Sequence, residues 1–467
     1  MVTSMPFLAA AALLLALTAA QATELTPAQQ AFRQIYQELV EINTTDSIGD
    51  TAKAAEAMAA RLRTAGIADV QVLSSGPRKG NLVARLRGTG ARRPILLIAH
   101  IDVVEAKRED WDSDPFKLEE VNGQFRARGS IDDKAMASAF VANLIEYAKE
   151  GFHPDRDIIV ALTTDEELSD SPHDGAHWLL QNHRPLIEAE FAINEGGGGS
   201  LRDGQPARLS VQLAEKVYQS YRLEVTDPGG HSAVPRPDNA IYRLAQALAR
   251  LAQFEFPISL NAVTRAYFER VAASERPDVA SAIAALLAGK TDDPSLALLT
   301  SSPTNNALLR TTCVATMLNA GEAENALPQT ARATVNCRLM PGQPTREVEV
   351  ALNRVINDPK VAVTPIGRAV ESPPSPINPE VIRAVERISS EIWPGVPVIP
   401  TMSGGYTDSR WLRNAGIPAY GVSGLFIDAA SGVHGRNEHV GVQHVYDCKE
   451  FLYRLVKTLA GGGLTSP

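Results

Sequence analysis

Hydrophobic and polar positions in the first part of the chain follow two patterns. Pro27–Leu39 and Thr51–Ala65 have the spacing of amphipathic helices, and Lys134–Lys149 also predicts a helix. Pro94–Ala99 and Asp157–Leu162 are continuous apolar runs, which are typical of strands buried on both faces. Helices that alternate with buried strands predict a layered α/β domain.

The pattern changes in the middle of the chain. Tyr218–Val225 and Ala331–Arg338 alternate polar and apolar residues, as antiparallel strands with one covered face do. Between them, Ala240–Gln253 and Val279–Leu287 predict helices, whereas Lys290–Pro303 has the composition of a loop. The buried α/β character then resumes, so we expect one α/β domain interrupted by an inserted α+β domain. The expected boundaries are 23–213 and 367–467 for the α/β domain, and 214–366 for the inserted domain.

Residues 1–22 are expected to be a signal peptide. Phe7–Ala20 is an apolar run, and Ala20, Gln21 and Ala22 form the small-residue pattern of a cleavage site. The run is shorter than the roughly 20 apolar residues that a membrane-spanning helix requires, and no later stretch resembles a membrane span. The sequence therefore predicts a secreted or periplasmic protein, with an uncleaved membrane anchor as the alternative.

Charge and cysteine usage narrow the function classes. The net charge is −9 over 467 residues, without a basic stripe to neutralise phosphates, so nucleic acid is not an expected partner. The three cysteines lack the CxxC spacing of a zinc knuckle, so a metal site would have to use His, Asp and Glu. Cys313 and Cys337 lie in strand-like runs and could pair in an oxidising compartment. The favoured interpretation is that they are two small buried residues.

Candidate metal ligands follow the buried strands or open a helix. Read alone, each motif has another interpretation: a chance His–Asp pair, acids that favour a helix dipole, or a solvated acidic loop. Ligands of open α/β sheets collect beyond the carboxyl ends of strands, however, and these motifs recur there. Two imidazoles with three or more carboxylates suit a pair of zinc ions, and Co²⁺ or Mn²⁺ can occupy similar sites. The motifs contain His100 and Asp102, Asp132, Glu166 and Glu167, Glu195, and His434.

The order of these motifs resembles the co-catalytic zinc metallopeptidase family of aminoacylase, glutamate carboxypeptidase, succinyl-diaminopimelate desuccinylase and yeast carboxypeptidase S. The resemblance covers essentially the whole chain after the signal peptide. It implies a zinc-exopeptidase-like catalytic domain with a mixed central sheet and an inserted α+β lid. It also implies the following roles: His100, Asp132 and Glu195 hold one zinc; Asp132, Glu167 and His434 hold the other; Glu166 is the general base; and Asp102 orients His100.

The inserted domain carries further motifs of this family. The GGHS-like segment implies that His231 contacts the oxyanion. The NxxP-like and RxxPG-like segments imply that Asn325 and Arg338 hold the substrate carboxylate, although Arg338 could instead pair with a neighbouring acid. The backbone of Gly404 and Gly405, in a glycine-rich loop, is expected to line the substrate pocket.

Two further questions concern extra histidines and oligomeric state. His173 and His177 could bind zinc if they lay on one helix, but the loop-like composition of Asp170–Gly175 favours surface histidines.

The family commonly dimerises through the lid, sometimes supplying the lid histidine from the partner. The extra sequence from about Phe256 to Asn305 resembles the carboxypeptidase S and N-acyl amino acid hydrolase branch, and it puts the usual homodimer in doubt.

The sequence therefore predicts a dizinc metallohydrolase that cleaves an amide bond adjacent to a free carboxylate. A carboxypeptidase-like exopeptidase acting on small peptides is the favoured interpretation, and an N-acyl amino acid hydrolase with the same catalytic residues is the alternative. A non-catalytic, zinc-dependent peptide-binding protein is disfavoured because Glu166 and every expected metal ligand are present.

Overall fold

The computed structural model describes residues 24–168 and 171–461. The expected signal peptide, residues 1–22, lies outside this range. Within the described residues, every helix is too short or too polar to cross a membrane.

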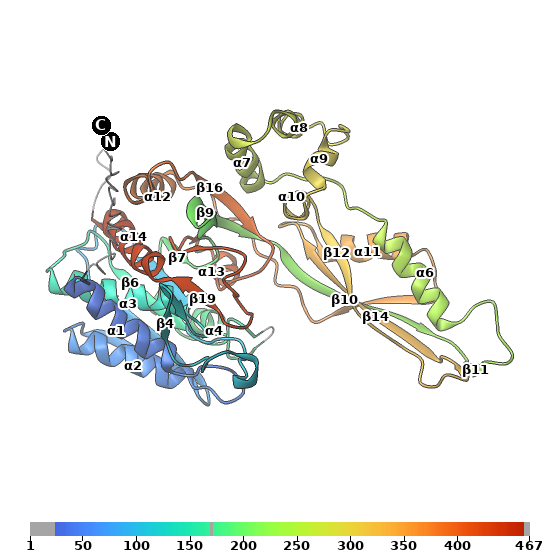
Figure 1. Cartoon of the computed structure of the whole chain (residues 1–467), viewed down its shortest axis with the longest axis horizontal. Coiled ribbons are helices and arrows are strands. Elements are labelled where there is room, and N and C mark those ends of the chain that lie inside the picture. The colour runs from blue at the N-terminus through green and yellow to red at the C-terminus, as the bar shows by residue number, and fades with distance from the viewer. Residues whose placement is uncertain (1–23, 169–170, 462–467) are drawn as a thin grey trace, which may run out of the picture.

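The larger body, here called the catalytic domain, is built on a ten-stranded sheet with the order β1-β2-β6-β3-β7-β17-β9-β8-β18, in which β16 also pairs with β9 (Figure 1). The central strand β3 runs parallel to β6 and β7, whereas β2 is antiparallel to β6, which confirms the expected mixed sheet. The strands are β1 (Asp69–Gly76), β2 (Lys79–Leu86), β3 (Ile95–His100), β6 (Ile158–Thr163), β7 (Phe191–Asn194), β8 (Gly199–Arg202), β9 (Gln205–Glu215), β16 (Val398–Ser403), β17 (Ala419–Gly421) and β18 (Phe426–Ile427).

Helices cover both faces of this sheet, which explains the continuous apolar runs of the central strands. Leu97 of β3 belongs to one hydrophobic cluster, and its neighbours Leu96 and Ile98 belong to another on the opposite face. One face carries α1 (Pro27–Glu41), α2 (Thr51–Thr64), α3 (Lys134–Lys149), α12 (Pro379–Ile392) and α14 (Val442–Ala460), and the other carries α4 (Gly175–Asn182), α5 (Arg184–Ile187) and α13 (Ser409–Asn414).

The smaller body, here called the lid, is a four-stranded antiparallel sheet with the order β12-β14-β10-β15. Its separate core forms where α6 and α11 cover this sheet with apolar side chains such as Leu244 and Leu352. A short pair of strands, β11 and β13, extends the lid at the end remote from the catalytic domain (Figure 1). The bounds are β10 (Val217–Thr226), β11 (Gly230–His231), α6 (Ala240–Ala252), β12 (Thr312–Ala320), β13 (Ala326–Leu327), β14 (Thr330–Leu339), α11 (Thr345–Ile356) and β15 (Val361–Ile366).

Four helices between α6 and β12, here called the insertion helices, pack on the catalytic domain. Phe268 of α7 joins the same hydrophobic cluster as Ile399 and Met402 of β16, and Arg270 donates a 2.9 Å hydrogen bond to the carbonyl oxygen of Val398. These helices therefore cross from the lid to the larger core and return to the lid at β12. They are α7 (Ala262–Val271), α8 (Pro277–Leu287), α9 (Leu296–Thr300) and α10 (Pro303–Leu309).

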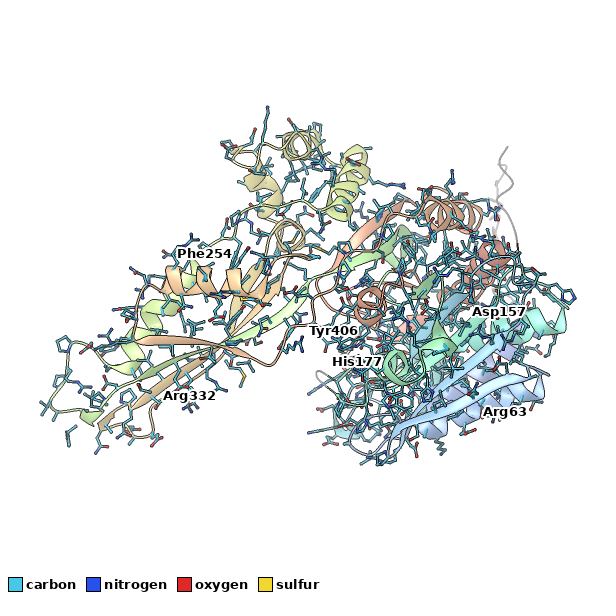
Figure 2. The ribbon with its side chains drawn as sticks, turned by 180° about the vertical axis from the view of Figure 1, so that it is seen from behind. Arg63, Asp157, His177, Phe254, Arg332 and Tyr406 are labelled. Atoms are coloured by element: carbon cyan, nitrogen blue, oxygen red, sulfur yellow. A yellow bond between two sulfur atoms is a disulfide. The ribbon has the colours of Figure 1, made fainter. Side chains whose placement is uncertain are left out.

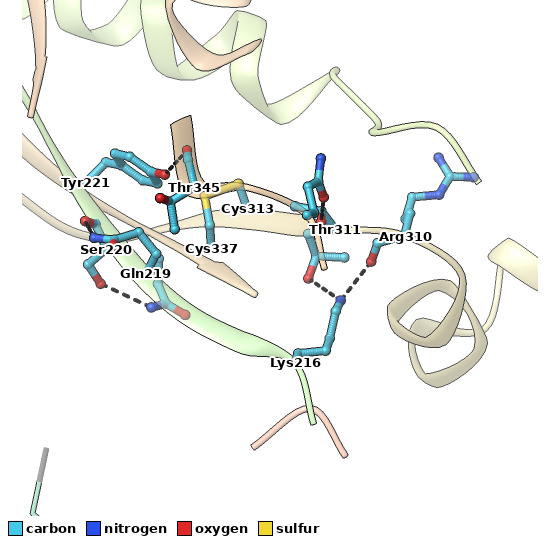
Figure 3. Close-up of a disulfide and its surroundings, with 12 residues drawn as sticks. Lys216, Gln219, Ser220, Tyr221, Arg310, Thr311, Cys313, Cys337 and Thr345 are labelled. Carbon is cyan, nitrogen blue, oxygen red and sulfur yellow. Dashed lines mark hydrogen bonds between the residues drawn. A yellow bond between two sulfur atoms is a disulfide. The ribbon is translucent and has the colours of Figure 1, made fainter. Parts of the chain in front are cut away.

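Two sequence-based expectations are wrong in this region. Lys290–Pro303 contains the short helix α9, whose Leu296 and Leu299 are buried, where the sequence pattern predicts a loop. Cys313 of β12 and Cys337 of β14 form a disulfide rather than remaining two separate buried residues (Figure 3). The two cysteines lie directly opposite in the register of neighbouring strands, a relation that no local pattern encodes. Cys448 is buried and free in α14.

The remaining elements lie near the site described below. A three-stranded sheet has the order β19-β5-β4, and it joins the segment before α3 to the segment before α14. Its strands are β4 (Glu119–Val121), β5 (Gln124–Arg126) and β19 (His439–Gly441), and the two 3₁₀ turns of the chain's described part are η1 (Arg108–Asp110) and η2 (Ala272–Ser274).

Candidate metal centre

Three adjacent parallel strands deliver the expected ligands to one edge of the catalytic sheet. His100 is the last residue of β3, Glu166 and Glu167 follow β6 after a short turn, and Glu195 follows β7 directly. Because β6, β3 and β7 are neighbours and run parallel, their carboxyl ends meet at the same edge.

Asp132 lies between two imidazoles. Its Oδ1 is 2.9 Å from Nε2 of His100, and its Oδ2 is 2.9 Å from Nε2 of His434. Nε2 of His434 is also 2.9 Å from Oε1 of Glu167. The family resemblance assigns these four side chains and Glu195 to two metal ions. Asp132, which the resemblance implies is shared by both ions, contacts both histidines.

Asp102 holds the other side of this arrangement. Nδ1 of His100 lies 3.0 Å from the carbonyl oxygen of Asp102 and 3.4 Å from its Oδ1. The carboxylate of Asp102 accepts hydrogen bonds from the backbone N–H of Glu166 at 3.3 Å and of Glu167 at 3.1 Å. Asp102 therefore fixes both the ring of His100 and the turn that carries the two glutamates.

Asp165, the first of the three consecutive acids, turns away from this cluster. It has a φ of 61°, and its carboxylate binds Nζ of Lys79 at 2.8 Å and the hydroxyl of Ser171 at 2.7 Å. Asp165 and Glu166 are buried, so the alternative of a solvated acidic loop is wrong. The separate ion pair with Lys79 leaves Glu166 and Glu167 to face the histidines.

The arrangement fits a pair of bound cations. Ligand atoms of His100, Asp132 and Glu167 lie within 4.8 Å of one another, as do those of His100, Glu166 and Glu195. Oε1 of Glu166 is buried without a hydrogen-bond partner in the described structure. So many partly or fully buried carboxylates would repel one another unless cations balanced them. Nitrogen and oxygen donors of this kind suit Zn²⁺, Co²⁺ or Mn²⁺.

The pKa values of these side chains depend on their burial and on the charges close to them. Burial raises the pKa of Glu166 and of Glu195 well above the ordinary range of a carboxyl group. The hydrogen bonds with Asp132 and Glu167 raise the pKa of His434 to about 10. Burial favours the neutral form of His100, but the carboxylates of Asp102 and Asp132 outweigh it and raise the pKa of this imidazole. The cluster therefore strongly favours positive charge close to its carboxylates, and a bound metal ion would supply that charge.

His231 and the four substrate-binding candidates fall into two groups. Nη1 of Arg338 donates to the carbonyl oxygen of Gly404 at 3.1 Å, next to Gly405, and its guanidinium lies over the ring of Tyr218 with the centroid 4.7 Å away. At the other end of the lid, His231 pairs with Ala326, and the N–H of Ser232 donates to the carbonyl oxygen of Asn325 at 3.0 Å.

These two groups are far apart within one chain. Arg338 lies near the end of β14, and the strand begins eight residues earlier at Thr330, which corresponds to about 26 Å. His231 and Asn325 lie beyond that beginning, at the tip of the lid (Figure 1). The structure therefore brings Arg338 to Gly404, but it does not bring His231 or Asn325 to either Arg338 or the metal ligands.

The other histidines in question belong to packing. Nδ1 of His173 lies 2.5 Å from the carbonyl oxygen of Ser75, and the ring of His177 stacks on Trp411 with centroids 3.9 Å apart. Neither joins the ligand sets found among the described residues. His177 lies on α4 and His173 precedes it, so the two do not share one helix.

A cleft of about 1060 Å³ separates the catalytic domain from the base of the lid. His177, Tyr406 and Arg410 line its catalytic side, and Tyr218 and Ile366 line its lid side. Figure 2 shows Tyr406 and His177 on the part of the catalytic domain that faces the lid. None of the candidate metal ligands is among the described residues that line this cleft.

Sequence reasoning gave no role to Arg128 or Glu438, although both lie beside motifs that it identified. Glu438 is fully buried and binds Arg128 at 2.6 Å. The local signal was the acid four residues after His434, but its partner lies more than three hundred residues away in the sequence. Only the fold shows the pair.

Comparison with known proteins agrees with this geometry. Residues 96–458 match Peptidase family M20/M25/M40. The chain belongs to this family. An N-fatty-acyl-amino acid synthase/hydrolase of Xenopus tropicalis is 31% identical over 376 residues, covering 78% of this chain and 72% of the relative. A probable carboxypeptidase S-like protein of Dictyostelium discoideum is 31% identical over 378 residues, covering 78% of this chain and 71% of the relative.

Solved structures share the fold. A metallo-carboxypeptidase of Sulfolobus solfataricus aligns with a TM-score of 0.66 at 18% identity, covering 91% of this chain and 98% of that chain. Human carnosine dipeptidase 1 aligns with a TM-score of 0.61 at 15% identity, covering 91% and 96%. The expected family and its hydrolase activity are thus confirmed: the protein is a metallopeptidase-type hydrolase with a candidate metal centre.

Proposed function

We propose that this hydrolase binds two zinc ions and releases a free amino acid from small peptides, in the manner of a carboxypeptidase. The observation that carries the proposal is the bridging position of Asp132 between His100 and His434. Asp132 and His100 would hold one ion with Glu195, and Asp132 and His434 would hold the other with Glu167. When bound, a zinc pair would lower the pKa of a water molecule and polarise the amide carbonyl.

Glu166 is proposed as the general base. Its carboxylate is buried beside the ligands, with Oε1 free of a partner in the described structure, and its backbone is held by Asp102. A carboxylate with a raised pKa is suited to accept a proton from the attacking water and to deliver it to the leaving amine. Glu166 would thereby serve both halves of the reaction.

Arg338 is proposed to bind the carboxylate of the substrate. In the described structure its guanidinium contacts a carbonyl oxygen and an aromatic ring rather than an acid. A guanidinium offers two parallel N–H donors to a carboxylate, and the backbone of Gly404 and Gly405 lies beside it. This arrangement favours substrates with a free carboxylate next to the scissile amide.

His231 and Asn325 are proposed to act in the site of a second copy of the chain. The opposite end of the lid sheet already carries Arg338, so both groups cannot reach one site together on the same lid. β12 is an edge strand of the lid, and it exposes Val314 (61%), Met317 (69%) and Leu318 (68%). An exposed apolar edge strand is suited to pair with the same strand of a partner, which supports a homodimer through the lid.

An N-acyl amino acid hydrolase is the second candidate. The Xenopus tropicalis relative carries that activity in its name, and the chemistry would be the same because the product is again a free amino acid. Only the group on the acyl side of the amide would differ.

We also propose that the protein acts outside the cytoplasm. The apolar run and cleavage pattern of residues 1–22 support export. The disulfide between Cys313 and Cys337 supports an oxidising compartment, because such bonds are rare in the cytosol of most organisms.

A matched substrate panel tests the proposed function. Zinc-loaded protein would be offered dipeptides, N-acetyl amino acids and long-chain N-acyl amino acids, each with a free carboxylate or as the amide, with and without chelator. Cleavage of free-acid dipeptides that chelator abolishes supports the carboxypeptidase, and cleavage of only the N-acyl amino acids supports the second candidate. Turnover that survives removal of all metal contradicts the proposal.

A further inference from the structure

A fully buried carboxylate beside the candidate metal centre is not one of the expected ligands. The side chain of Glu438 is completely buried in the loop that follows His434. Its Oε2 accepts hydrogen bonds from Nη1 of Arg128 at 2.6 Å and from the N–H of Gly129 at 3.1 Å. Its Oε1 accepts from the N–H of Ile131 at 2.7 Å and of Asp132 at 3.3 Å. One carboxylate thus organises the whole turn that presents Asp132.

Arg128 connects Glu438 to the loop that carries His434. Its Nη2 donates to the carbonyl oxygen of Gly435 at 2.7 Å, and its guanidinium lies over the ring of Trp111 at 5.2 Å from the centroid. Arg128 is only 2% exposed. A buried ion pair is costly unless further hydrogen bonds satisfy it, and removal of one partner leaves an unpaired buried charge. Both carboxylate oxygens of Glu438 accept from the segment 128–132, and Nη2 of Arg128 donates to the loop of His434, whereas Nε of Arg128 is buried without a hydrogen-bond partner among the described residues.

These contacts link two segments that are distant in the sequence. Pairing of β5 with β19 brings Arg126 opposite His439, and the Arg128–Glu438 pair continues that link toward Asp132 and His434. This link holds His434 close to Asp132: Nε2 of His434 lies 2.9 Å from Oδ2 of Asp132. By contrast, His100 and Glu195 are attached to the buried strands β3 and β7, which pair with each other directly.

We propose that the Arg128–Glu438 pair is a positioning pair for one of the two metal ions, the ion that Asp132 shares with Glu167 and His434. The inference rests on the proposed dimetal function. His434 lies on a loop, and its side chain is 53% exposed, so its approach to Asp132 depends on this pair. The ion held by His100, Asp132 and Glu195 depends on it less, because two of its ligands are set by the sheet.

Substitution of Glu438 tests the inference. Glu438→Gln keeps the volume but replaces one acceptor oxygen with an amide group that must face N–H donors. Glu190→Gln is the matched control: it removes the 2.9 Å partner of the fully buried Arg156 just before the start of β7, away from the ligands. Metal-free protein would be titrated with Zn²⁺ by calorimetry and with Co²⁺ by visible absorption, and its thermal unfolding would be recorded without metal.

We expect the wild type and Glu190→Gln to bind two ions alike. Glu438→Gln should weaken binding of the ion held by His100, Asp132 and Glu195 only slightly, and should bind the other ion about 10- to 100-fold more weakly, the usual effect of losing an outer partner of a ligand. Equal affinity for both ions in Glu438→Gln and wild type would overturn the inference, and so would an equal loss at both sites.

A second variant keeps the test decisive if Glu438→Gln does not fold. Arg128→Lys retains the charge, but a single ammonium cannot hold both Glu438 and Gly435 in the same forked geometry. It should show the same selective loss, and two unchanged affinities would reject the positioning role. Failure of the wild type to bind two ions would remove the dimetal function itself. If the wild type binds two ions and is active, and both variants bind the two ions as the wild type does, only the positioning role of the pair is rejected.

Discussion

Glu166 differs from the neighbouring acids in its contacts. Glu167 lies against His434, and Asp165 is paired with Lys79, but Oε1 of Glu166 is buried without a hydrogen-bond partner among residues 24–168 and 171–461. Burial is the main reason for its raised pKa; the charge of His100 opposes this rise, and nearby carboxylates such as Glu195 add to it. A group with these properties is better placed to move a proton than to serve as an additional permanent ligand.

Replacement of Glu166 should therefore separate binding of metal from turnover. Glu166→Gln should retain both metal ions while kcat falls by about 10²- to 10⁴-fold, the range typical of a lost general base. Metal content and kcat would be measured on the same preparation. Glu120→Gln, at a half-exposed ion pair with Arg33, is the control and should leave kcat unchanged. Wild-type turnover in Glu166→Gln would exclude its role as the base.

Arg338 should determine the requirement for a free carboxylate. Loss of a hydrogen bond to a charged group costs about 1.5–3 kcal/mol, so Arg338→Met should lower kcat/KM for free-acid substrates by roughly 10- to 100-fold. The matching amides should be affected far less. Arg338→Lys keeps the charge without the fork and should give an intermediate loss. A similar loss on acids and amides would show that Arg338 supports only the structure around Gly404.

The metal-ligand candidates could be predicted because each lies at the end of a local pattern. His100 and Glu195 directly end or follow buried apolar runs, and parallel strands bring such ends together. The separation of His231 from Arg338 could not be predicted, because it depends on how β10, β14 and the short tip strands align. Strand register is a long-range property, and the same reason hid the pairing of Cys313 with Cys337.

Among the elements, the helices and strands predicted from clear patterns agree with the structure to within a few residues, but no prediction covers β9, β16 or α12. The predicted helix Lys134–Lys149 has the same bounds as α3. The predicted strand Pro94–Ala99 corresponds to β3, Ile95–His100, which is shifted by one residue. The insertion helices were less predictable: α9 is only one turn long, and its burial depends on packing against neighbouring helices. A short apolar segment has no periodicity that distinguishes a helix from a loop.

The packing of α7 on β16 leads to a stability prediction. Phe268 is fully buried in the core that contains Ile399, so Phe268→Ala should lower the free energy of unfolding by about 3–5 kcal/mol. Hydrogen exchange should quicken in β16 of the catalytic domain more than in β14 of the lid. Leu298→Ala, at a 42% exposed site on α9, should change stability by no more than about 0.5 kcal/mol. Faster exchange in the lid alone would contradict the prediction, because it would mean that the insertion helices stabilise the lid rather than the catalytic domain.

At the scale of the whole molecule, one chain does not bring together all of the residues proposed for the site. The metal ligands and Arg338 lie at or near the catalytic side of the chain, but His231 and Asn325 lie at the far tip of the lid (Figure 1). A swing of the rigid lid cannot correct this, because Arg338 and the tip are fixed at opposite ends of one hydrogen-bonded sheet. A second chain that pairs along β12 would supply the missing tip.

Mixed dimers can decide whether His231 acts in the partner's site. His231→Ala and Glu166→Ala should each be nearly inactive alone. If His231 acts across the dimer, random mixing of the two variants by unfolding and refolding together makes half of the dimers mixed, and each mixed dimer contains one site with both residues. Activity should then return to about a quarter of the wild-type value. If His231 acts within its own chain, every site lacks one residue and no activity returns. Refolding each variant alone is the control, and Val314→Lys on the exposed face of β12 should prevent the recovery by separating the chains.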